Sequence, residues 1–259
     1  MKNARISARG YMLGYNDLKD PSVPRLFRLL ARLGDGYMKM QIVRMDFTEL
    51  MKMGLYRKFI NQTRKPEGFL GRMMVNGMNG GHAKLADWGM THLAGISPAG
   101  IAELGCGGGR NTAELLKRYP EATVTALDYS PVSVEKAKTL NKDMIAAGRC
   151  AVICGNVAEL PFEEGAFDLA TAFETVYFWP GLGRCFSEVY RILKPGGEFM
   201  ICNESDGTDE TSKKYEKIID GMKCYTVGEI TAALTSAGFS DVRSDHYDGK
   251  PWITVTARK

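Results

Sequence analysis

A glycine-rich turn is the part of the sequence best suited to hold a ligand. Residues 100–104 read Gly-Ile-Ala-Glu-Leu, and residues 105–109 read Gly-Cys-Gly-Gly-Gly. Glycines permit positive φ angles and let a ligand approach the backbone without a Cβ in the way. Glu103 puts a negative charge beside the turn, which disfavours a phosphate there. The pattern predicts a strand, a tight turn and a helix start that receive a ligand without phosphate groups.

Two common nucleotide-binding patterns do not fit this turn. A dinucleotide site spaces its glycines as G-x-G-x-x-G, whereas Gly105, Gly107 and Gly109 alternate. A P-loop needs Lys and then Ser or Thr after its last glycine, but Arg110 and Asn111 follow Gly109. The turn therefore belongs to another kind of ligand site.

A second acidic residue follows at the spacing that a ribose-binding site requires. Residues 124–127 form an apolar run that ends in Asp128, about 20 positions beyond the turn. A carboxylate at the end of this next strand is placed to accept hydrogen bonds from both ribose hydroxyls. Further apolar runs at 151–154 and 167–172 predict two more strands.

The ordered set of motifs resembles the class I S-adenosylmethionine-dependent methyltransferases, whose motif I reads E-x-G-x-G-x-G, as residues 103–109 do. Leu-Pro-Phe at 160–162 and Leu-Lys-Pro-Gly-Gly at 193–197 are similar to the ubiquinone and menaquinone biosynthesis group. The resemblance implies an α/β fold: a Rossmann-like, seven-stranded, mostly parallel sheet with an antiparallel C-terminal strand and helices on both faces. It places this domain at 95–259, after a helical N-terminal cap at 1–94.

The resemblance also implies the cofactor, S-adenosyl-L-methionine, with S-adenosyl-L-homocysteine as the product. Asp128 is expected to hold the ribose and Tyr129 to pack on the adenine. Asn156 stands where the family usually has Asp, and its amide oxygen can accept a bond from the adenine amino group. The expected cofactor-binding residues are Glu103, Gly105, Cys106, Gly107, Asp128, Tyr129, Asn156, Val157 and Glu174.

The acceptor side is expected after the predicted fourth strand, where residues 174–180 read Glu-Thr-Val-Tyr-Phe-Trp-Pro. Ligands of open α/β sheets bind outside the carboxyl ends of the strands. The expected catalytic residues are Glu174, Tyr177 and His82, and the expected acceptor-binding residues are Tyr177, Trp179 and Glu204. A structural role in the core or as a cap is the alternative for each, and for Phe178 the core is favoured.

The function that follows is methyl transfer to a small organic acceptor at O, N, S or C by in-line displacement. The cofactor supplies the reactivity, so no catalytic triad is expected. The sequence lacks Asn-Pro-Pro-Tyr and Pro-Cys in this region, which argues against methylation of base amines, glutamine amides or cytosine C5. Two alternatives stay open: an RNA methyltransferase that uses the basic N-terminal segment, and a cofactor-binding protein without turnover.

Composition agrees with a globular enzyme. Hydrophobic residues make up 44% and charged residues 25% of the 259-residue chain. No apolar run approaches the ~20 residues of a membrane span, and no signal-peptide core follows Met1, so a cytoplasmic location is expected. The six cysteines are scattered and are expected to be reduced thiols. No His, Cys, Asp or Glu group shows metal-ligand spacing, so no metal is expected.

The N-terminal third differs from the rest of the chain. It has an excess of Lys and Arg over acids, and most of the 14 methionines precede residue 91. Helices are predicted at 24–33, 47–60, 69–79 and 82–95. Three roles compete: a cap that closes over the substrate, a nucleic-acid surface, and contact with a membrane surface or partner through the amphipathic helix at 24–33. A homodimer is left open.

The C-terminal end is predicted to complete the sheet. Thr226 and Glu229 form a capping box at the start of a helix over 227–237. Alternating runs at 241–247 and 252–257 predict two strands. In the superfamily that the chain resembles, these two strands form an antiparallel hairpin at the sheet edge.

Overall fold

The computed structural model describes residues 7–8, 11–12, 55–68, 71–75 and 82–259. The predicted helix at 24–33 lies outside the described residues, as do 47–54, 69–70 and 76–79 of the two following helices. The described parts contain α4 (Leu55–Ile60), a helical stretch at 71–75 and α6 (Ala83–Thr91), and β1 (Ser7–Ala8) pairs with β2 (Tyr11–Met12).

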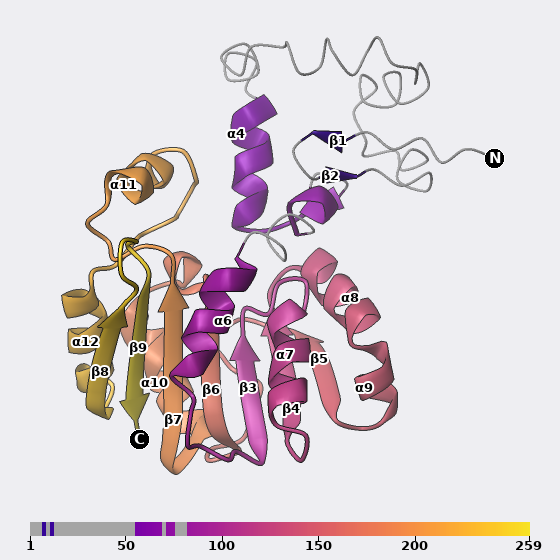
Figure 1. The fold of residues 1–259 in the computed structure, drawn as a ribbon, viewed down its shortest axis with the longest axis vertical. Coiled ribbons are helices and arrows are strands. Elements are labelled where there is room, and N and C mark those ends of the chain that lie inside the picture. Colours follow the sequence, from indigo (N-terminus) through magenta and orange to yellow (C-terminus); the bar gives the residue numbers. More distant parts are fainter. Residues whose placement is uncertain (1–6, 9–10, 13–54, 69–70, 76–81) are drawn as a thin grey trace.

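A seven-stranded sheet forms the centre of the described structure (Figure 1). Its spatial order is β5-β4-β3-β6-β7-β9-β8. Only the pairs that include β9 are antiparallel. The strands are β3 (Gly100–Leu104), β4 (Thr123–Asp128), β5 (Cys150–Cys154), β6 (Phe167–Phe173), β7 (Leu193–Asn203), β8 (Ser240–His246) and β9 (Ile253–Arg258). This topology confirms the predicted fold class.

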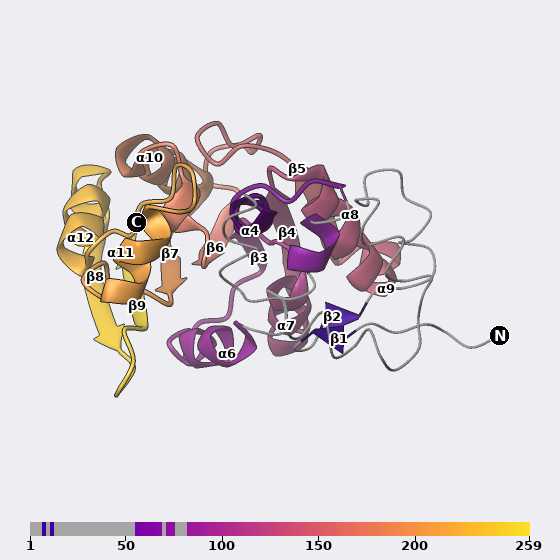
Figure 2. The same cartoon turned by 90° about the horizontal axis from the view of Figure 1, so that it is seen from above.

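Helices cover both faces of the sheet (Figure 2). On one face, α6, α7 (Arg110–Arg118) and α8 (Pro131–Leu140) pack in one apolar cluster, and α9 (Lys142–Ala146) continues from α8. On the other face, α10 (Leu182–Ile192) and α12 (Val227–Ser236) pack in a second cluster. The capping box of Thr226 and Glu229 at the start of α12 is confirmed.

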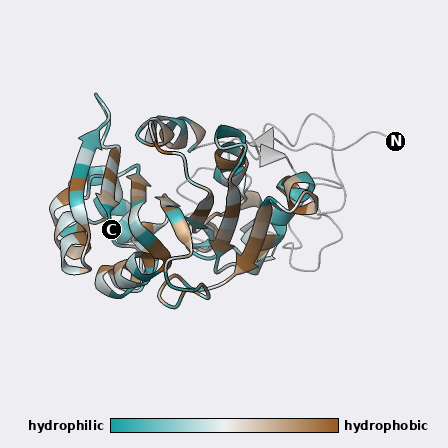
Figure 3. Cartoon of the chain, turned by 90° about the horizontal axis from the view of Figure 1, so that it is seen from below, coloured by the Kyte–Doolittle hydropathy of each residue, from teal (hydrophilic) through white to brown (hydrophobic). Residues whose placement is uncertain are grey.

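Burial follows from this layering. The inner strands are covered on both faces, and β3 and β6 are accordingly apolar and buried along most of their length. The outer strand β8 is mostly exposed and polar. Figure 3 shows the hydrophobic colour along the inner strands and more hydrophilic colour on the outer hairpin. Parallel strands of this kind end at one edge of the sheet, where the loops can build a site.

Residues 57–67 form a bridging segment above the carboxyl ends of the strands (Figure 1). At one end, Ser130 Oγ donates a hydrogen bond to the carbonyl oxygen of Pro66 at 2.6 Å. At the other end, the backbone N–H of Asp220 donates to Asn61 Oδ1 at 2.8 Å. The segment is therefore attached on both sides of the sheet's central strands.

The cysteines carry free thiols in this structure. All six cysteines are free; Cys154 is exposed and the other five are buried. Among the described residues, no helix combines the length and the apolar character needed to cross a bilayer.

Helix α6 approaches the sheet closely because of one glycine. A Cβ added to Gly89 would lie 2.6 Å from Cys202 Sγ on β7. The thiol of Cys202 also donates to the carbonyl oxygen of Leu85, at 3.6 Å. The fit matters for the site, because His82 is the N-cap residue of α6.

We expect Gly89→Ala to destabilise the protein by about 1–3 kcal/mol, the usual cost of overpacking a close contact. Gly183→Ala in α10 is the matched control, since its added Cβ meets nothing within 4 Å. Alanine should there be neutral or stabilising by up to about 1 kcal/mol. Urea unfolding of both variants measures the difference, and equal stabilities would contradict the close α6–β7 contact.

Candidate functional site

The turn after β3 depends on glycine at two positions. Gly105 has a φ of +85°, and a Cβ there would lie 2.1 Å from Thr175 Oγ1. Gly109 has a φ of +78° and is the N-cap of α7, where a Cβ would lie 2.7 Å from Ala137 Cα. Both positions combine a left-handed backbone with a close neighbour, so other residues would displace the loop.

Asp128 connects this turn to the end of β4. Its Oδ2 accepts the N–H of Gly107 at 2.9 Å, and its Oδ1 accepts the N–H of Ser130 at 2.8 Å. A carboxylate offers about four lone-pair sites, so these two bonds leave acceptor capacity for a ligand. The carboxylate is thus held in place and still able to bind hydroxyl groups.

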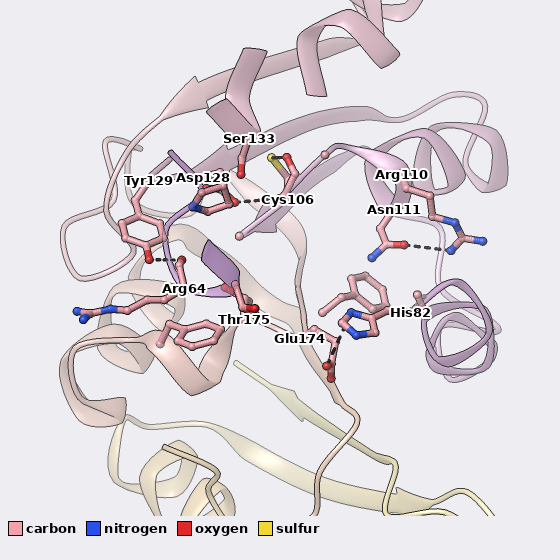
Figure 4. A pocket seen from close by; sticks show the side chains of 18 of the residues that line it. Arg64, His82, Cys106, Arg110, Asn111, Asp128, Tyr129, Ser133, Glu174 and Thr175 are labelled. Carbon is pink, nitrogen blue, oxygen red and sulfur yellow. Dashed lines mark hydrogen bonds and ion pairs between the residues drawn. The ribbon is translucent and has the colours of Figure 1, made fainter. Parts of the chain in front are cut away.

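A cavity of about 780 Å³ lies between the glycine turn and the bridging segment, and we call it the donor cavity (Figure 4). A second space of about 750 Å³ continues from it and shares Gly105, Asp128 and Tyr129. The predicted residues that line these two spaces are His82, Gly105, Cys106, Gly107, Asp128, Tyr129, Asn156, Val157, Glu174 and Trp179.

Two predicted adenine-side residues also contact the protein itself. The hydroxyl of Tyr129 donates to the carbonyl oxygen of Arg64 in the bridging segment (Figure 4). Asn156 Oδ1 accepts the N–H of Ala158 at 3.0 Å, which orients its amide. Both side chains lie in the wall shared with Val157, and their contacts with a cofactor stay predictions.

Glu103 lies beneath the turn and not in the cavity wall. Its side chain is buried, and it accepts a hydrogen bond from Thr112 Oγ1 on α7. Burial raises the pKa of Glu103 to about 8, and the hydrogen bond from Thr112 only partly offsets this. Any effect of Glu103 on a ligand is therefore electrostatic or transmitted through the turn.

Four predicted residues meet at one end of the donor cavity, and we call them the junction cluster: His82, Glu174, Tyr177 and Glu204. Glu174 Oε1 accepts bonds from the Tyr177 hydroxyl, at 3.1 Å, and from the backbone N–H of Glu204. The side chains of His82 and Glu174 point toward each other (Figure 4), with His82 Nδ1 4.0 Å from Glu174 Oε2. His82 Nε2 lies 3.7 Å from Glu204 Oε2.

The environment of this cluster shifts the pKa values of three of its members, and burial raises that of Tyr177. Burial and then the charge of Glu204 raise the pKa of Glu174 to about 8. Burial lowers the pKa of His82, although Glu204 opposes the shift. Glu174 also has a φ of +58°, which is unusual for a residue other than glycine. Glu174 is thus a buried carboxyl group at the centre of the cluster, with little positive charge beside it.

The cluster is a geometry that sequence spacing does not reveal. One ligand atom from each of His82, Glu174 and Glu204 lies within 4.8 Å of the others. Such a set can hold a cation, whereas the sequence, in which the three residues are far apart, gave no metal-ligand pattern. That no metal is bound stays a prediction; the spacing in the sequence does not indicate that the fold brings these three residues together.

Two predictions in this region need correction. Trp179 does not lie with Tyr177 and Glu204: its ring is buried in the core and stacks on Phe199, with centroids 6.3 Å apart. It lines the second space together with Asn156, and not the space that Tyr177 and Glu204 border. Phe178, which was assigned to the core, is only half-buried and lines the donor cavity. The single 3₁₀ turn η3 (Val176–Phe178) rotates consecutive side chains in a way that the sequence pattern does not indicate.

Several other residues that line the donor cavity are not among the predicted site residues. Thr63, Arg64 and Pro66 reach the donor cavity from the bridging segment, and Thr175 reaches it from the loop after β6. The two remaining histidines lie outside the cavity, and His92 instead bonds Asp245 at 2.8 Å.

Comparison with known proteins agrees with this geometry. Residues 102–201 match a family described as a methyltransferase domain. The chain is 27% identical over 168 residues to a sterol 24-C-methyltransferase from Pneumocystis carinii (strain B80), covering 59% of this chain and 44% of the relative. It is 30% identical over 159 residues to a malonyl-[acyl-carrier protein] O-methyltransferase from Geobacter sulfurreducens, covering 57% and 58%.

A solved structure shows the same fold. The geranyl diphosphate C-methyltransferase from Streptomyces coelicolor A3(2), in complex with Mg²⁺, geranyl diphosphate and S-adenosyl-L-homocysteine, superposes with a TM-score of 0.60 at 14% identity. The match covers 68% of this chain and 80% of that one. The chain spans less than half the length of the sterol methyltransferases that it matches.

The raised pKa of Glu174 predicts a pH-dependent stability. Folding holds its pKa at about 8 against an ordinary 4.5, so the unfolded chain ionises first and stability falls as pH rises through this interval. Glu174→Gln removes the effect. We expect the variant to gain stability relative to the parent between about pH 5 and pH 8, by on the order of a few kcal/mol. Denaturant unfolding at both pH values tests this; a constant difference would refute the shift.

Proposed function

Since the chain belongs to the class I S-adenosylmethionine-dependent methyltransferase superfamily, we propose that it transfers a methyl group from S-adenosyl-L-methionine to a small organic acceptor. The observation that carries the proposal is the pairing of the glycine turn with Asp128. These two features come from adjacent parallel strands and line one cavity, where the nucleoside and the sulfur-bearing tail of the cofactor would lie side by side.

The charges of the donor cavity suit this cofactor. Asp128 and Glu174 line the cavity and Glu103 lies beneath its turn, and burial is the chief cause that raises the pKa of all three. A positively charged ligand would let such carboxyl groups ionise, because an opposite charge favours the charged form. S-adenosyl-L-methionine carries a sulfonium and an ammonium group and no phosphate. A dinucleotide would instead add negative charge at the same place.

The walls of the cavity supply the remaining contacts. Asp128 would hold the ribose hydroxyls with its free lone pairs, and Tyr129 and Val157 would border the adenine. Leu85 and Phe178 give the cavity apolar surface for the rest of the molecule. When bound, the cofactor supplies an activated methyl group on a sulfonium. The bridging segment contributes Thr63, Arg64 and Pro66 to the wall of the cavity.

The junction cluster would serve the acceptor. Glu174 borders both the donor cavity and a further cavity on its other side. A carboxyl group there can accept a proton from the acceptor when the nucleophile carries one. The named relatives place the methyl on carbon in one case and on oxygen in the other, so they leave the methylated atom of this chain's acceptor open.

Turnover tests the proposal directly. The full chain is incubated with S-adenosyl-L-methionine and either a small-metabolite extract or total RNA, and S-adenosyl-L-homocysteine is quantified by mass spectrometry. Product that depends on the metabolite extract supports the proposal. Product that depends on RNA would favour the nucleic-acid alternative, and tight cofactor binding with neither product would favour a protein without turnover.

Asp128→Asn should weaken the binding of S-adenosyl-L-homocysteine by about 1–3 kcal/mol, the scale for hydrogen bonds to a charged group. Isothermal titration calorimetry measures the affinity, and urea unfolding checks that the variant is folded. Glu135→Gln is the control, because this carboxylate on α8 is exposed and borders neither space of the site. An unchanged affinity for Asp128→Asn would remove the ribose assignment.

A further inference from the structure

A separate cavity of about 760 Å³ lies on the far side of the junction cluster, and we call it the acceptor cavity. Its walls come from the ends of β6 and β7, from α11 (Glu210–Glu216) and its N-cap, and from the turn between β8 and β9. These elements lie together at one end of the sheet (Figure 1). Glu174 borders both this cavity and the donor cavity, so the two spaces meet at its side chain.

Carboxyl groups dominate the charge of the acceptor cavity. Glu174, Glu204 and Asp209 line it, and Lys250 is the one Lys or Arg among its described lining residues. Burial alone would raise the pKa of Asp209, but hydrogen bonds from Ser205 and Ser212 lower it, so this carboxylate is charged at neutral pH. Among these lining groups, acidic side chains therefore outnumber basic ones.

Aromatic rings give the cavity a second preference for positive charge. Tyr177, Tyr215 and Trp252 line it. The Lys250 ammonium lies 3.9 Å from the centroid of the Trp252 ring, so Lys250 occupies this ring face. Aromatic faces attract ammonium groups, so Tyr177 and Tyr215 are the rings that can contact a cationic ligand.

We propose that the acceptor cavity binds the methyl acceptor and that this acceptor is a small organic amine, which enters as an ammonium ion. The inference rests on the proposed function. The carboxylates of Glu174 and Glu204 receive the ammonium group, and the aromatic rings hold the carbon body. An alcohol of the same size carries no charge to pair with these carboxylates, and the cavity offers a carboxylic acid one cationic side chain, Lys250, among its described lining residues.

The amine fits the junction cluster better than a metal ion does. His82 presents Nδ1 toward Glu174 and Nε2 toward Glu204, at 4.0 and 3.7 Å. One atom from each of the three residues lies within 4.8 Å of the others, but the two imidazole nitrogens face different carboxylates, which suits a ligand with several hydrogen-bond donors. Glu174 Oε1 is also occupied by two hydrogen-bond donors.

The chemistry balances without a further reagent. The ammonium gives one proton to the carboxylate of Glu174, which frees the nitrogen lone pair. That pair forms the new N–C bond at the donor methyl group while the C–S bond breaks, and its electrons stay on sulfur as a neutral thioether. The product leaves as a methylated ammonium. Burial favours the protonated form of Glu174, so its carboxylate takes up a proton more readily than an exposed one does.

Binding of matched probes tests this inference. The full chain is saturated with S-adenosyl-L-homocysteine and titrated by calorimetry with benzylamine, benzyl alcohol and benzoate, and with ethanolamine, ethylene glycol and glycolate. We expect at least one amine to bind about tenfold or more tightly than its hydroxyl and carboxylate analogues. With S-adenosyl-L-methionine, mass spectrometry should find the bound amine N-methylated.

Two variants locate the binding. Glu204→Gln should weaken the amine about tenfold or more and leave the affinity for S-adenosyl-L-homocysteine unchanged, because Glu204 does not border the donor cavity. Glu210→Gln is the matched control on the same part of the fold; its side chain is 93% exposed and does not line the cavity. Equal effects of the two variants would overturn the assignment of the cavity.

The remaining outcomes are distinct. Normal binding of S-adenosyl-L-homocysteine with no binding of either amine, or with equal binding of an alcohol or acid, overturns the amine and leaves the proposed function standing. Binding that requires added Mg²⁺ or Mn²⁺ overturns it in favour of a metal site. A failure to bind S-adenosyl-L-homocysteine at all overturns both proposals together.

Discussion

The carboxylate of Asp128 is the contact on which the rest of the site depends. It fixes the glycine turn through the N–H of Gly107 and the start of α8 through the N–H of Ser130. Ser130 in turn bonds the backbone of Pro66. Asp128 therefore connects the loop after β3 with α8 and, through Ser130, with the bridging segment. Asp128 also lines the donor cavity, so the carboxylate that holds the turn in place is the one that a bound ligand would meet.

Buried acidic residues determine the electrostatic character of the site. Parallel strands bring the acidic residues Glu103, Asp128 and Glu174 to the carboxyl end of the sheet, and burial leaves them poorly compensated. Burial favours the protonated form of such groups, and an opposite charge nearby favours their ionised form. Across Glu174, the acceptor cavity is lined by two further acidic side chains, Glu204 and Asp209. On the two proposals made above, each cavity receives a positively charged group.

The fold could be predicted from the sequence because its strands and helices are encoded by short apolar runs and by the turn and cap residues between them. Apolar runs, the turn at 105–109 and the capping box at Thr226 each lie within a few residues, and all are found in the structure. The convergence of His82 with Glu204 depends on how α6 packs on β7, which no short segment encodes. Trp179 was misassigned for a related reason: a single helical turn decides whether it faces ligand or core.

Glu174 occupies a left-handed backbone conformation, which costs a residue with a Cβ about 1–2 kcal/mol and glycine almost nothing. Laboratory evolution for heat resistance would therefore tend to replace it with glycine or asparagine. On the proposed chemistry, evolution for turnover would keep the glutamate. The two selections would pull this one codon in opposite directions, so sequence variation there would record which pressure a population had experienced.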